Sequence, residues 1–209
     1  LLARAMTILA DDGDLDIIRT VSAAVVQMAE GEALEVQYRD LFDLSIDQHL
    51  RVLDMKTARF VDCCCRVGAC AVGGSSEAIE ALASYGRHLG LAFQIVDDLL
   101  DYRGRQDTTG KPRATDFREA CATLPLLLLR EELTEEETSF VRRKFGNGVT
   151  DDEIDMIVCW MEARGTFEKV ETMAKAHADS ALHALEVLPQ GQHRDALAAA
   201  VDFVLQRNS

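Results

Sequence analysis

The stretch Phe93-Gln94-Ile95-Val96-Asp97-Asp98-Leu99-Leu100-Asp101 places three carboxylates inside an otherwise apolar run. On a helix, Asp97 and Asp101 lie one turn apart on the same face, with Asp98 beside them. Like charges at this spacing repel one another and weaken a helix, so folding alone does not favour the choice. Carboxylate oxygens are the ligands that Mg²⁺ prefers, and Mg²⁺ held by one or two carboxylates usually also binds substrate phosphates. The stretch therefore predicts a helix that carries a Mg²⁺ and diphosphate site.

A second stretch, Asp151-Asp152-Glu153-Ile154-Asp155, has the same spacing and serves as an internal control. Its acids follow Thr150 at a predicted helix start, where the helix dipole favours negative charge and side-chain oxygens cap free amides. Capping therefore explains the second stretch. The first stretch lies near the C-terminal end of a long apolar helix, where the dipole disfavours acids, so a cation-binding role is the better explanation there.

Apolar residues recur at helical spacing along nearly the whole chain, and no alternating strand pattern of useful length occurs. Only three prolines interrupt the 209 residues, which permits long helices. Capping-box sequences begin at Ser45, Thr134 and Thr150, and Gly73-Gly74-Ser75-Ser76 breaks the long middle region. The polar segment 105–116 is expected to be an exposed loop. The patterns predict an all-α chain forming one domain over residues 1–209, with helices over about 2–10, 15–38, 46–72, 77–103 and 124–129, after Thr134 and Thr150, and on either side of Pro189.

The composition narrows the classes of partner. The formal net charge of −14 argues against non-specific binding to nucleic acid or to an anionic membrane surface. No apolar span of transmembrane length occurs, so no transmembrane segment is expected. The six cysteines form no C-x-x-C pair and are read as small apolar residues in a reducing compartment, cytoplasmic or mitochondrial, with no targeting segment to decide the localisation. The first residues, 1–6, read as the interior of a helix, so we expect either that the chain was cut there or that an upstream part is missing.

Two lysines have both a structural and a functional reading. Lys56-Thr57 lies mid-helix on an apolar pattern, where the lysine either extends to solvent beside a packed threonine or contacts a diphosphate. Lys111 follows Gly110 in the polar loop, and this pair suits either an ordinary turn or close approach to a phosphate. Asp116 and Arg118 can be read as a surface pair. The five histidines have no metal-ligand spacing and are expected to be structural or exposed.

Taken together, these residues resemble the trans-isoprenyl diphosphate synthases, the polyprenyl synthetase family, over nearly the whole chain. The strongest match is Gly90-Leu91-Ala92-Phe93-Gln94-Ile95-Val96-Asp97-Asp98-Leu99-Leu100-Asp101, which resembles the second aspartate-rich motif of the family. The first residues, 1–5, resemble the segment that follows the family's first aspartate-rich motif. Further matches in the same order and at fitting intervals are Glu30-Gly31-Glu32, Lys56-Thr57-Ala58, Gly110-Lys111-Pro112, Asp116-Phe117-Arg118-Glu119 and Thr123-Leu124-Pro125.

The resemblance implies an antiparallel helical bundle around a central cavity, the isoprenoid synthase fold, lacking its N-terminal part here. It implies an enzyme of the long-chain type that condenses an allylic diphosphate with isopentenyl diphosphate, as a homodimer or as a heteromer with a related subunit. The implied metal is Mg²⁺, held by Asp97, Asp98 and Asp101. The implied substrate contacts are Lys56, Thr57, Gln94 and Lys111, and Lys56, Gln94 and Asp97 are the implied catalytic residues.

Three departures from the family pattern bear on activity. The first aspartate-rich motif and the upstream Gly-Lys-Arg segment are absent, so these 209 residues alone are expected to be inactive. Glu35 stands where the family commonly has Gln, although Gln37 lies two residues on and an alignment slipped by two residues would restore the match. Cys121 replaces the Lys that commonly precedes Val-Thr-Leu-Pro, which removes a positive charge near the phosphates.

Two other classes of protein remain open from the residues. A non-catalytic subunit or scaffold with a decayed synthase fold, acting through a partner chain, fits the missing motif and Cys121. The retained charges of the aspartate stretch and Lys56 favour an enzyme instead. A terpene cyclase shares the fold class and the metal chemistry, but the Gly-Lys-Pro and Thr-Leu-Pro matches favour chain elongation. Product length cannot be read, because the length-setting positions of the family lie near its first motif.

Overall fold

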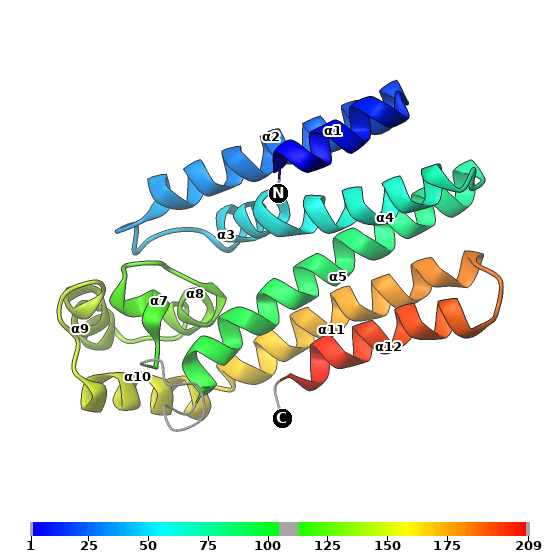
Figure 1. Cartoon of the computed structure of the whole chain (residues 1–209). Helices are drawn as coiled ribbons and strands as arrows, with labels where there is room; N and C mark the ends of the chain where they lie inside the picture. The colour runs from blue at the N-terminus through cyan, green and yellow to red at the C-terminus, as the bar shows by residue number, and fades with distance from the viewer. Residues whose placement is uncertain (1, 105–112, 208–209) are drawn as a thin grey trace.

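The computed structural model describes residues 2–104 and 113–207, and every regular element in those two ranges is helical (Figure 1). The all-α prediction is therefore confirmed. No helix in these ranges is both long and apolar enough to cross a membrane. In chain order the elements are α1 (Leu2–Asp12), α2 (Leu15–Tyr38), α3 (Ile46–Leu53), η1 (Asp54–Ala58), α4 (Arg59–Ala71), α5 (Ser76–Arg103), α7 (Thr115–Arg118), α8 (Leu124–Arg130), α9 (Glu135–Lys144), α10 (Asp151–Ala163), α11 (Thr166–Ala184), η2 (Leu185–Val187) and α12 (Gln192–Gln206).

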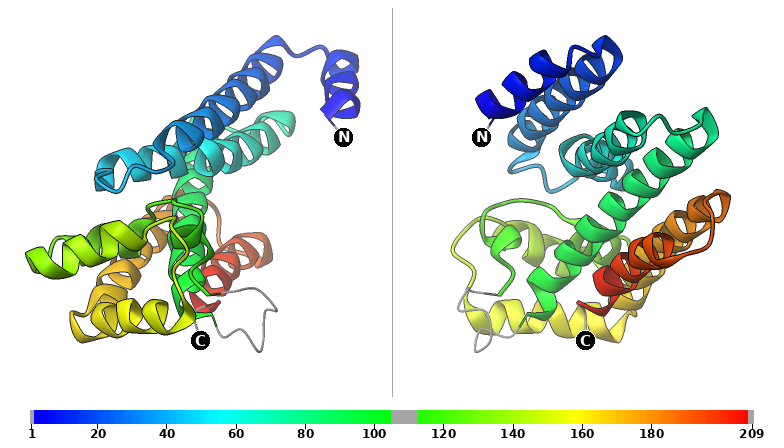
Figure 2. Two further views of the ribbon diagram at one scale, coloured as in Figure 1. Left: turned by 90° about the vertical axis from the view of Figure 1, so that its left-hand side faces the viewer. Right: turned by 45° about the vertical axis from the view of Figure 1, so that its right-hand side comes forward.

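Helix α5 runs through the middle of the molecule and carries the aspartate stretch near its C-terminal end (Figure 1). It packs lengthwise against α4 on one side and against α11 on the other, and α12 lies beside α11. Helices α7 to α10 gather around the C-terminal end of α5, as Figure 2 shows from two further sides. The aspartate stretch consequently lies where the long helices meet this group of shorter helices.

Local capping explains where several helices begin. The side chains of Ser45, Thr134 and Thr150 each accept a hydrogen bond from a backbone N–H in the first turn. Each of these residues also donates its own backbone N–H to a side-chain oxygen three residues on, which completes a capping box. Ser75 caps α5 by accepting a bond from the N–H of Ala78. These predicted helix starts are confirmed.

The structure differs from the sequence expectations in two places. The predicted helix after Ser45 contains a π-helical turn, η1, which joins α3 to α4. The predicted exposed loop over 105–116 is wrong in the part that the structure describes, because Ala114 is fully buried and α7 begins at Thr115. The remainder of that segment, with Gly110 and Lys111, lies outside the described residues.

Close backbone contacts hold η1 between two glycines. A Cβ on Gly31 of α2 would lie 2.8 Å from the backbone nitrogen of Lys56, and a Cβ on Gly90 of α5 would lie 2.7 Å from the Cα of Ala58. Because no side chain fits in these gaps, both helices approach the η1 backbone directly. The position of Lys56 is therefore set by main-chain contact from two sides.

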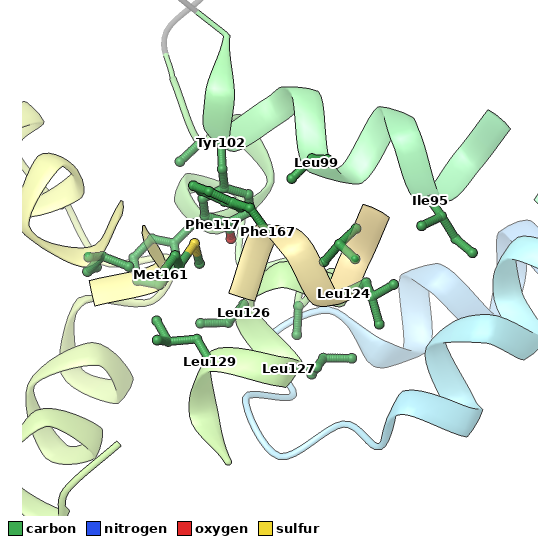
Figure 3. Close-up of a cluster of buried hydrophobic side chains, with 14 of the residues drawn as sticks. Ile95, Leu99, Tyr102, Phe117, Leu124, Leu126, Leu127, Leu129, Met161 and Phe167 are labelled. Carbon is green, nitrogen blue, oxygen red and sulfur yellow. The ribbon is translucent and has the colours of Figure 1, made fainter. Parts of the chain in front are cut away.

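A single apolar cluster supports the aspartate stretch from below (Figure 3). On α5, Ile95, Val96 and Leu99 are fully buried and Asp98 is buried as well, whereas Asp97 keeps 37% of its side chain exposed. Burial of side chains of this size contributes about 1.5–3 kcal/mol each. The helix that presents the carboxylates is therefore rigidly placed. The labelled members of the cluster are Ile95, Leu99, Tyr102, Phe117, Leu124, Leu126, Leu127, Leu129, Met161 and Phe167.

Candidate active site

Asp98 is buried, with 6% of its surface exposed, and its role in the structure is to join three elements. Its Oδ2 lies 2.6 Å from Nε2 of His49 on α3 and accepts a hydrogen bond of 3.3 Å from the backbone N–H of Leu124 at the start of α8. Because a buried carboxylate without partners is costly, these bonds are needed for α5 to keep an acid here. One of its two oxygens is thus committed within the protein.

Asp101 binds the N-terminal end of α7. Its two carboxylate oxygens accept hydrogen bonds of 3.0 and 3.1 Å from the backbone N–H groups of Thr115 and Asp116. Its carbonyl oxygen accepts a further bond from Ala114, which has a left-handed backbone with φ of 55°. Burial raises the pKa of Asp101 above its usual value, and the two N–H bonds offset this in part.

Asp97 is the most accessible acid of the stretch, with 37% of its side chain exposed. Its Oδ1 lies 2.9 Å from Nη2 of Arg207, which follows the last turn of α12. The guanidinium also lies over the ring of Phe93, one helical turn before Asp97, with 4.6 Å between its Cζ and the ring centroid. Burial raises the pKa of Asp97 in spite of the ion pair with Arg207.

Asp116 belongs to this group of acids, and its reading as a surface pair with Arg118 is wrong. Arg118 instead pairs with Asp151 at 2.6 Å. Asp116 is half-buried, and burial together with the carboxylates of Asp101, Asp98 and Glu35 raises its pKa to about 7. A strong shift caused by burial and like charges marks a place that lacks positive charge.

Lys56 lies in η1 and is paired with acids from α2. Its Nζ lies 2.6 Å from Oε2 of Glu35 and 3.2 Å from Oε2 of Glu32. Burial lowers the pKa of Lys56, but the two carboxylates outweigh that effect and hold the pKa above its ordinary value. The residue noted as a departure from the family, Glu35, is therefore the direct partner of the candidate phosphate ligand.

The other predicted contacts lie around Lys56 and the aspartates. Thr57 follows Lys56 in η1, and Gln94 lies one turn before Asp98 on α5; both are half-buried. Lys111 lies outside the described residues, so its place relative to the acids stays a prediction. The central cavity expected for the fold also stays a prediction. A small hollow of about 30 Å³ borders the site, lined in part by Glu35, His49 and Cys121.

The donor set fits a metal that is shared with a ligand and does not fit one enclosed by protein. Within residues 2–104 and 113–207 no three His, Cys, Asp or Glu side chains converge on one metal position. Mg²⁺ usually takes only one or two carboxylates from the protein and completes its shell with water and phosphate oxygens. Asp97 is accessible, and Asp101 and Asp116 have raised pKa values that a cation would lower again. These residues fit a Mg²⁺ that also binds an anionic ligand.

The sequence does not predict three features of the site. His49 is structural, as expected, but its bond to Asp98 has no signal in the sequence, and no pattern points to Arg207. The surface reading of Asp116 is wrong. The bonds of His49 and Arg207 join positions far apart in the chain, and no local pattern signals them. For Asp116 a signal was present, because it lies in the matched stretch 116–119.

Comparison with known proteins agrees with the geometry. A family model described as "Polyprenyl synthetase" matches residues 1–160. The chain is 31% identical over 207 residues to an all-trans-nonaprenyl-diphosphate synthase (geranyl-diphosphate specific) of Rhodobacter capsulatus, covering 99% of this chain and 63% of that protein. It is 33% identical over 205 residues to the octaprenyl diphosphate synthase of Escherichia coli strain K12, covering 98% of this chain and 64% of that protein.

Solved structures of similar proteins have the same fold. A polyprenyl synthase from Caulobacter crescentus CB15, complexed with calcium and isoprenyl diphosphate, superimposes with a TM-score of 0.92 at 33% identity, covering 99% of this chain and 63% of that one. A decaprenyl diphosphate synthase from Rhodobacter capsulatus gives a TM-score of 0.91 at 32% identity, with 99% and 64% covered. The chain therefore has the all-α isoprenoid synthase fold, and it spans a little less than two thirds of the length of these relatives.

Proposed function

We propose that this chain, which belongs to the polyprenyl synthetase family, serves a Mg²⁺-dependent prenyltransferase that condenses an allylic diphosphate with isopentenyl diphosphate into a polyprenyl diphosphate. The observation that carries the proposal is the acidic group at the end of α5. Asp97 is accessible there, and burial together with neighbouring carboxylates raises the pKa values of Asp101 and Asp116. Glu35 links this group to Lys56, because its carboxylate pairs with the lysine and also raises the pKa of Asp116. An acidic group with a lysine near it suits a metal-bound diphosphate.

In this proposal the three aspartates have different tasks. Asp97 and Asp101 hold Mg²⁺ through their carboxylate oxygens, and Asp98, tied to His49 and Leu124, fixes the helix that presents them. Bound Mg²⁺ neutralises the charge that develops on the departing diphosphate. The buried apolar cluster under α5 keeps this helix from yielding when the charge changes.

Lys56, Thr57, Gln94 and Lys111 are the proposed contacts of the allylic diphosphate. Lys56 is held in η1 by Gly31 and Gly90, so its nitrogen has a defined place from which to donate hydrogen bonds. An ammonium group has three donors, and Glu35 and Glu32 take up two of them, so more than one bond to a phosphate requires Lys56 to leave a glutamate. Lys56, Gln94 and Asp97 are the residues we assign to catalysis.

The named relatives support the substrate class. Nonaprenyl-, octaprenyl- and decaprenyl-diphosphate synthases are among the similar proteins, which supports a long-chain product. We further propose that residues 1–209 contribute to a single domain and that the protein works as a homodimer or with a related subunit. One relative, from rice, is named as mitochondrial, which keeps both proposed compartments open.

A second candidate, a non-catalytic subunit acting through a partner chain, is favoured by one observation. The ammonium group of Lys56 is neutralised by two carboxylates, and Cys121 brings no positive charge to the same region. Such a site binds a diphosphate less strongly than one with free cations. The alternative predicts that the protein changes the activity of its partner without binding an allylic diphosphate itself.

The test is elongation of geranyl or farnesyl diphosphate with labelled isopentenyl diphosphate by the full-length protein in Mg²⁺. The proposal expects polyprenyl diphosphate products that disappear when the metal is chelated. Residues 1–209 by themselves, which contain one aspartate-rich motif of the family type, are expected to give no product. Absence of turnover by the full-length protein, alone and with a related subunit, would contradict the enzymatic proposal and support the scaffold.

A further inference from the structure

Arg207 forms an ion pair with the aspartate stretch, and its contacts within the described residues are incomplete. It gives Asp97 one ion pair through Nη2 and places its plane over Phe93 on the same face of α5. Its other terminal nitrogen, Nη1, is buried and has no hydrogen-bond partner among the described residues. A guanidinium has five N–H donors in a fixed plane, and a buried donor without an acceptor is unfavourable.

The contacts with Asp97 and Phe93 hold the guanidinium in place, while the unpaired Nη1 leaves one of its donors without a hydrogen bond. The aromatic ring and the single carboxylate keep Arg207 at the motif, and the unpaired Nη1 limits how strongly it is kept. The side chain of Arg207 is 30% exposed, so water can take over its hydrogen bonds when it leaves. Such a pair is suited to exchange.

We propose that Arg207 is a positioning residue that acts as a built-in counter-ion of Asp97, holding this carboxylate in the metal-free protein and releasing it to a divalent cation. This inference rests on the proposed metal-binding function of Asp97. Arg207 and the cation compete for one oxygen, Oδ1, because a metal ion and a guanidinium cannot occupy the same side of it. Binding of the metal therefore frees the end of α12 from α5.

The consequence is a coupling between the metal site and the C-terminal turn of α12. Without metal, Arg207 neutralises part of the charge that would otherwise lie unscreened beside Asp98 and Asp101. With metal, that task passes to the cation and the tether is lost. The two states thus differ in the freedom of the last turn of α12, which is measurable apart from any chemical reaction.

The experiment titrates Mn²⁺ into the full-length protein and measures free Mn²⁺ by its paramagnetic resonance signal. Asp97→Asn identifies the part of the binding that depends on this motif. Arg207→Gln is expected to tighten that part by up to about fivefold, the equivalent of the roughly 1 kcal/mol that a partly exposed ion pair is worth. Arg207→Lys keeps the charge and loses the planar donor, so its Mn²⁺ affinity is expected to lie between those of the unmodified protein and Arg207→Gln.

Two controls separate competition from general charge effects. Arg142→Gln removes a matched arrangement that does not include Asp97, in which Arg142 pairs with Asp43 at 2.6 Å and lies 4.5 Å from the ring centroid of Phe42. Arg103→Gln removes a positive charge from the same end of α5 without touching Asp97, since Arg103 pairs with Glu171. Competition requires the effect of Arg207→Gln to exceed both.

Hydrogen exchange gives an independent measurement. Addition of Mn²⁺ is expected to speed exchange of the last amides of α12 in the unmodified protein and to leave them unchanged in Asp97→Asn. Equal Mn²⁺ affinity in Arg207→Gln and the unmodified protein, with no change in α12, would overturn the counter-ion while leaving the metal site intact. If Asp97→Asn does not weaken Mn²⁺ binding, either in the unmodified protein or in combination with Arg207→Gln, the metal site and the counter-ion are both overturned.

Discussion

The stretches 97–101 and 151–155 have the same spacing of acids and opposite surroundings. In the first, Asp98 is buried against His49, Asp101 binds the start of another helix, and Asp97 faces Arg207. In the second, the acids open α10, where Asp151 and Asp155 are 72% and 65% exposed. The first set bonds to four other parts of the chain, whereas the second contributes to its own helix start and to surface ion pairs.

The difference teaches that position within the helix decides what an acidic triplet does. At the start of α10 the free N–H groups and the dipole favour negative charge, and the capping box of Thr150 and Glu153 uses it. At the end of α5 neither benefit exists. The acids there are kept by long-range bonds, and the pKa values of Asp97 and Asp101 are raised. A cost to folding remains, and the proposed cation would relieve it.

The largest expected contrast is in turnover. Asp97→Ala should lower the turnover of the full-length protein by about 100-fold or more, because it removes charge stabilisation felt mainly in the transition state. Asp152→Ala, which changes an exposed acid of the second stretch, should leave turnover within about twofold. Steady-state assays with labelled isopentenyl diphosphate measure both, and equal effects of the two changes would contradict the assignment of the metal to α5.

The next contrast is in stability. His49→Ala should lower the free energy of unfolding by roughly 2–4 kcal/mol, because it leaves the carboxylate of Asp98 buried without its partner. Asp152→Ala should change the same quantity by at most about 0.5 kcal/mol, since this acid lies on an exposed helix start. Denaturant unfolding followed by circular dichroism makes the comparison; a His49 variant as stable as the Asp152 variant would show that Asp98 does not depend on the imidazole.

A smaller contrast depends on pH. The folded-state pKa of Asp116 is about 7 against 3.8 for the ordinary value, so the folded protein holds a proton there that the unfolded chain has lost. Its contribution to stability therefore falls as pH rises from about 4 to about 7. Asp116→Asn should remove this loss and raise stability in metal-free buffer at pH 8 by roughly 1–3 kcal/mol, with no gain near pH 4.

Thermal unfolding of the unmodified protein and of Asp116→Asn, measured between pH 4 and pH 8, tests the sign of this pH dependence of stability. Asp155→Asn is the matched change in the second stretch and should show no such pH-dependent gain. A gain from Asp116→Asn that is the same at pH 4 and pH 8 would mean that the amide improves packing and that repulsion among the acids is not the cause.

The smallest expected effect belongs to the cap of α10. Thr150→Ala should cost about 1 kcal/mol of stability, because the N–H of Glu153 loses its acceptor. Turnover at a temperature well below unfolding should not change. Ser75→Ala, which removes the cap of α5, is the comparison: it should cost a similar amount, and a loss of turnover with Thr150→Ala alone would link α10 to the site.

The sequence predicts the helices well because their signals are local. Residues 15–38 form α2 as expected, and the capping boxes at Ser45, Thr134 and Thr150 begin their helices. Apolar spacing and a capping side chain act within a few residues, so they can be read from the chain without its fold. The π-turn and the four-residue α7 were missed because both are set by contacts with distant elements.

The candidate site is harder than the helices to predict from local sequence patterns. The aspartate stretch was found because its acids conflict with local rules for helices. The partners of those acids obey their local rules: His49 lies in an amphipathic helix and Arg207 at a helix C-terminal end, where a cation is ordinary. Their significance arises only when α3 and α12 reach α5. Glu35 was noted as a departure from the family, but its bond to Lys56 required the structure.

The π-turn η1 has a consequence for how this chain tolerates insertions and deletions. One extra residue in a helical turn shifts the helical phase by about 100°, so α3 and α4 have separate phases although they form one continuous rod. His49 must meet Asp98 before the turn, and Ala58 must meet Gly90 at its end. Loss of a single residue from 54–58 would rotate one of these contacts away from α5. Changes in length are therefore confined to the loops on either side of the rod.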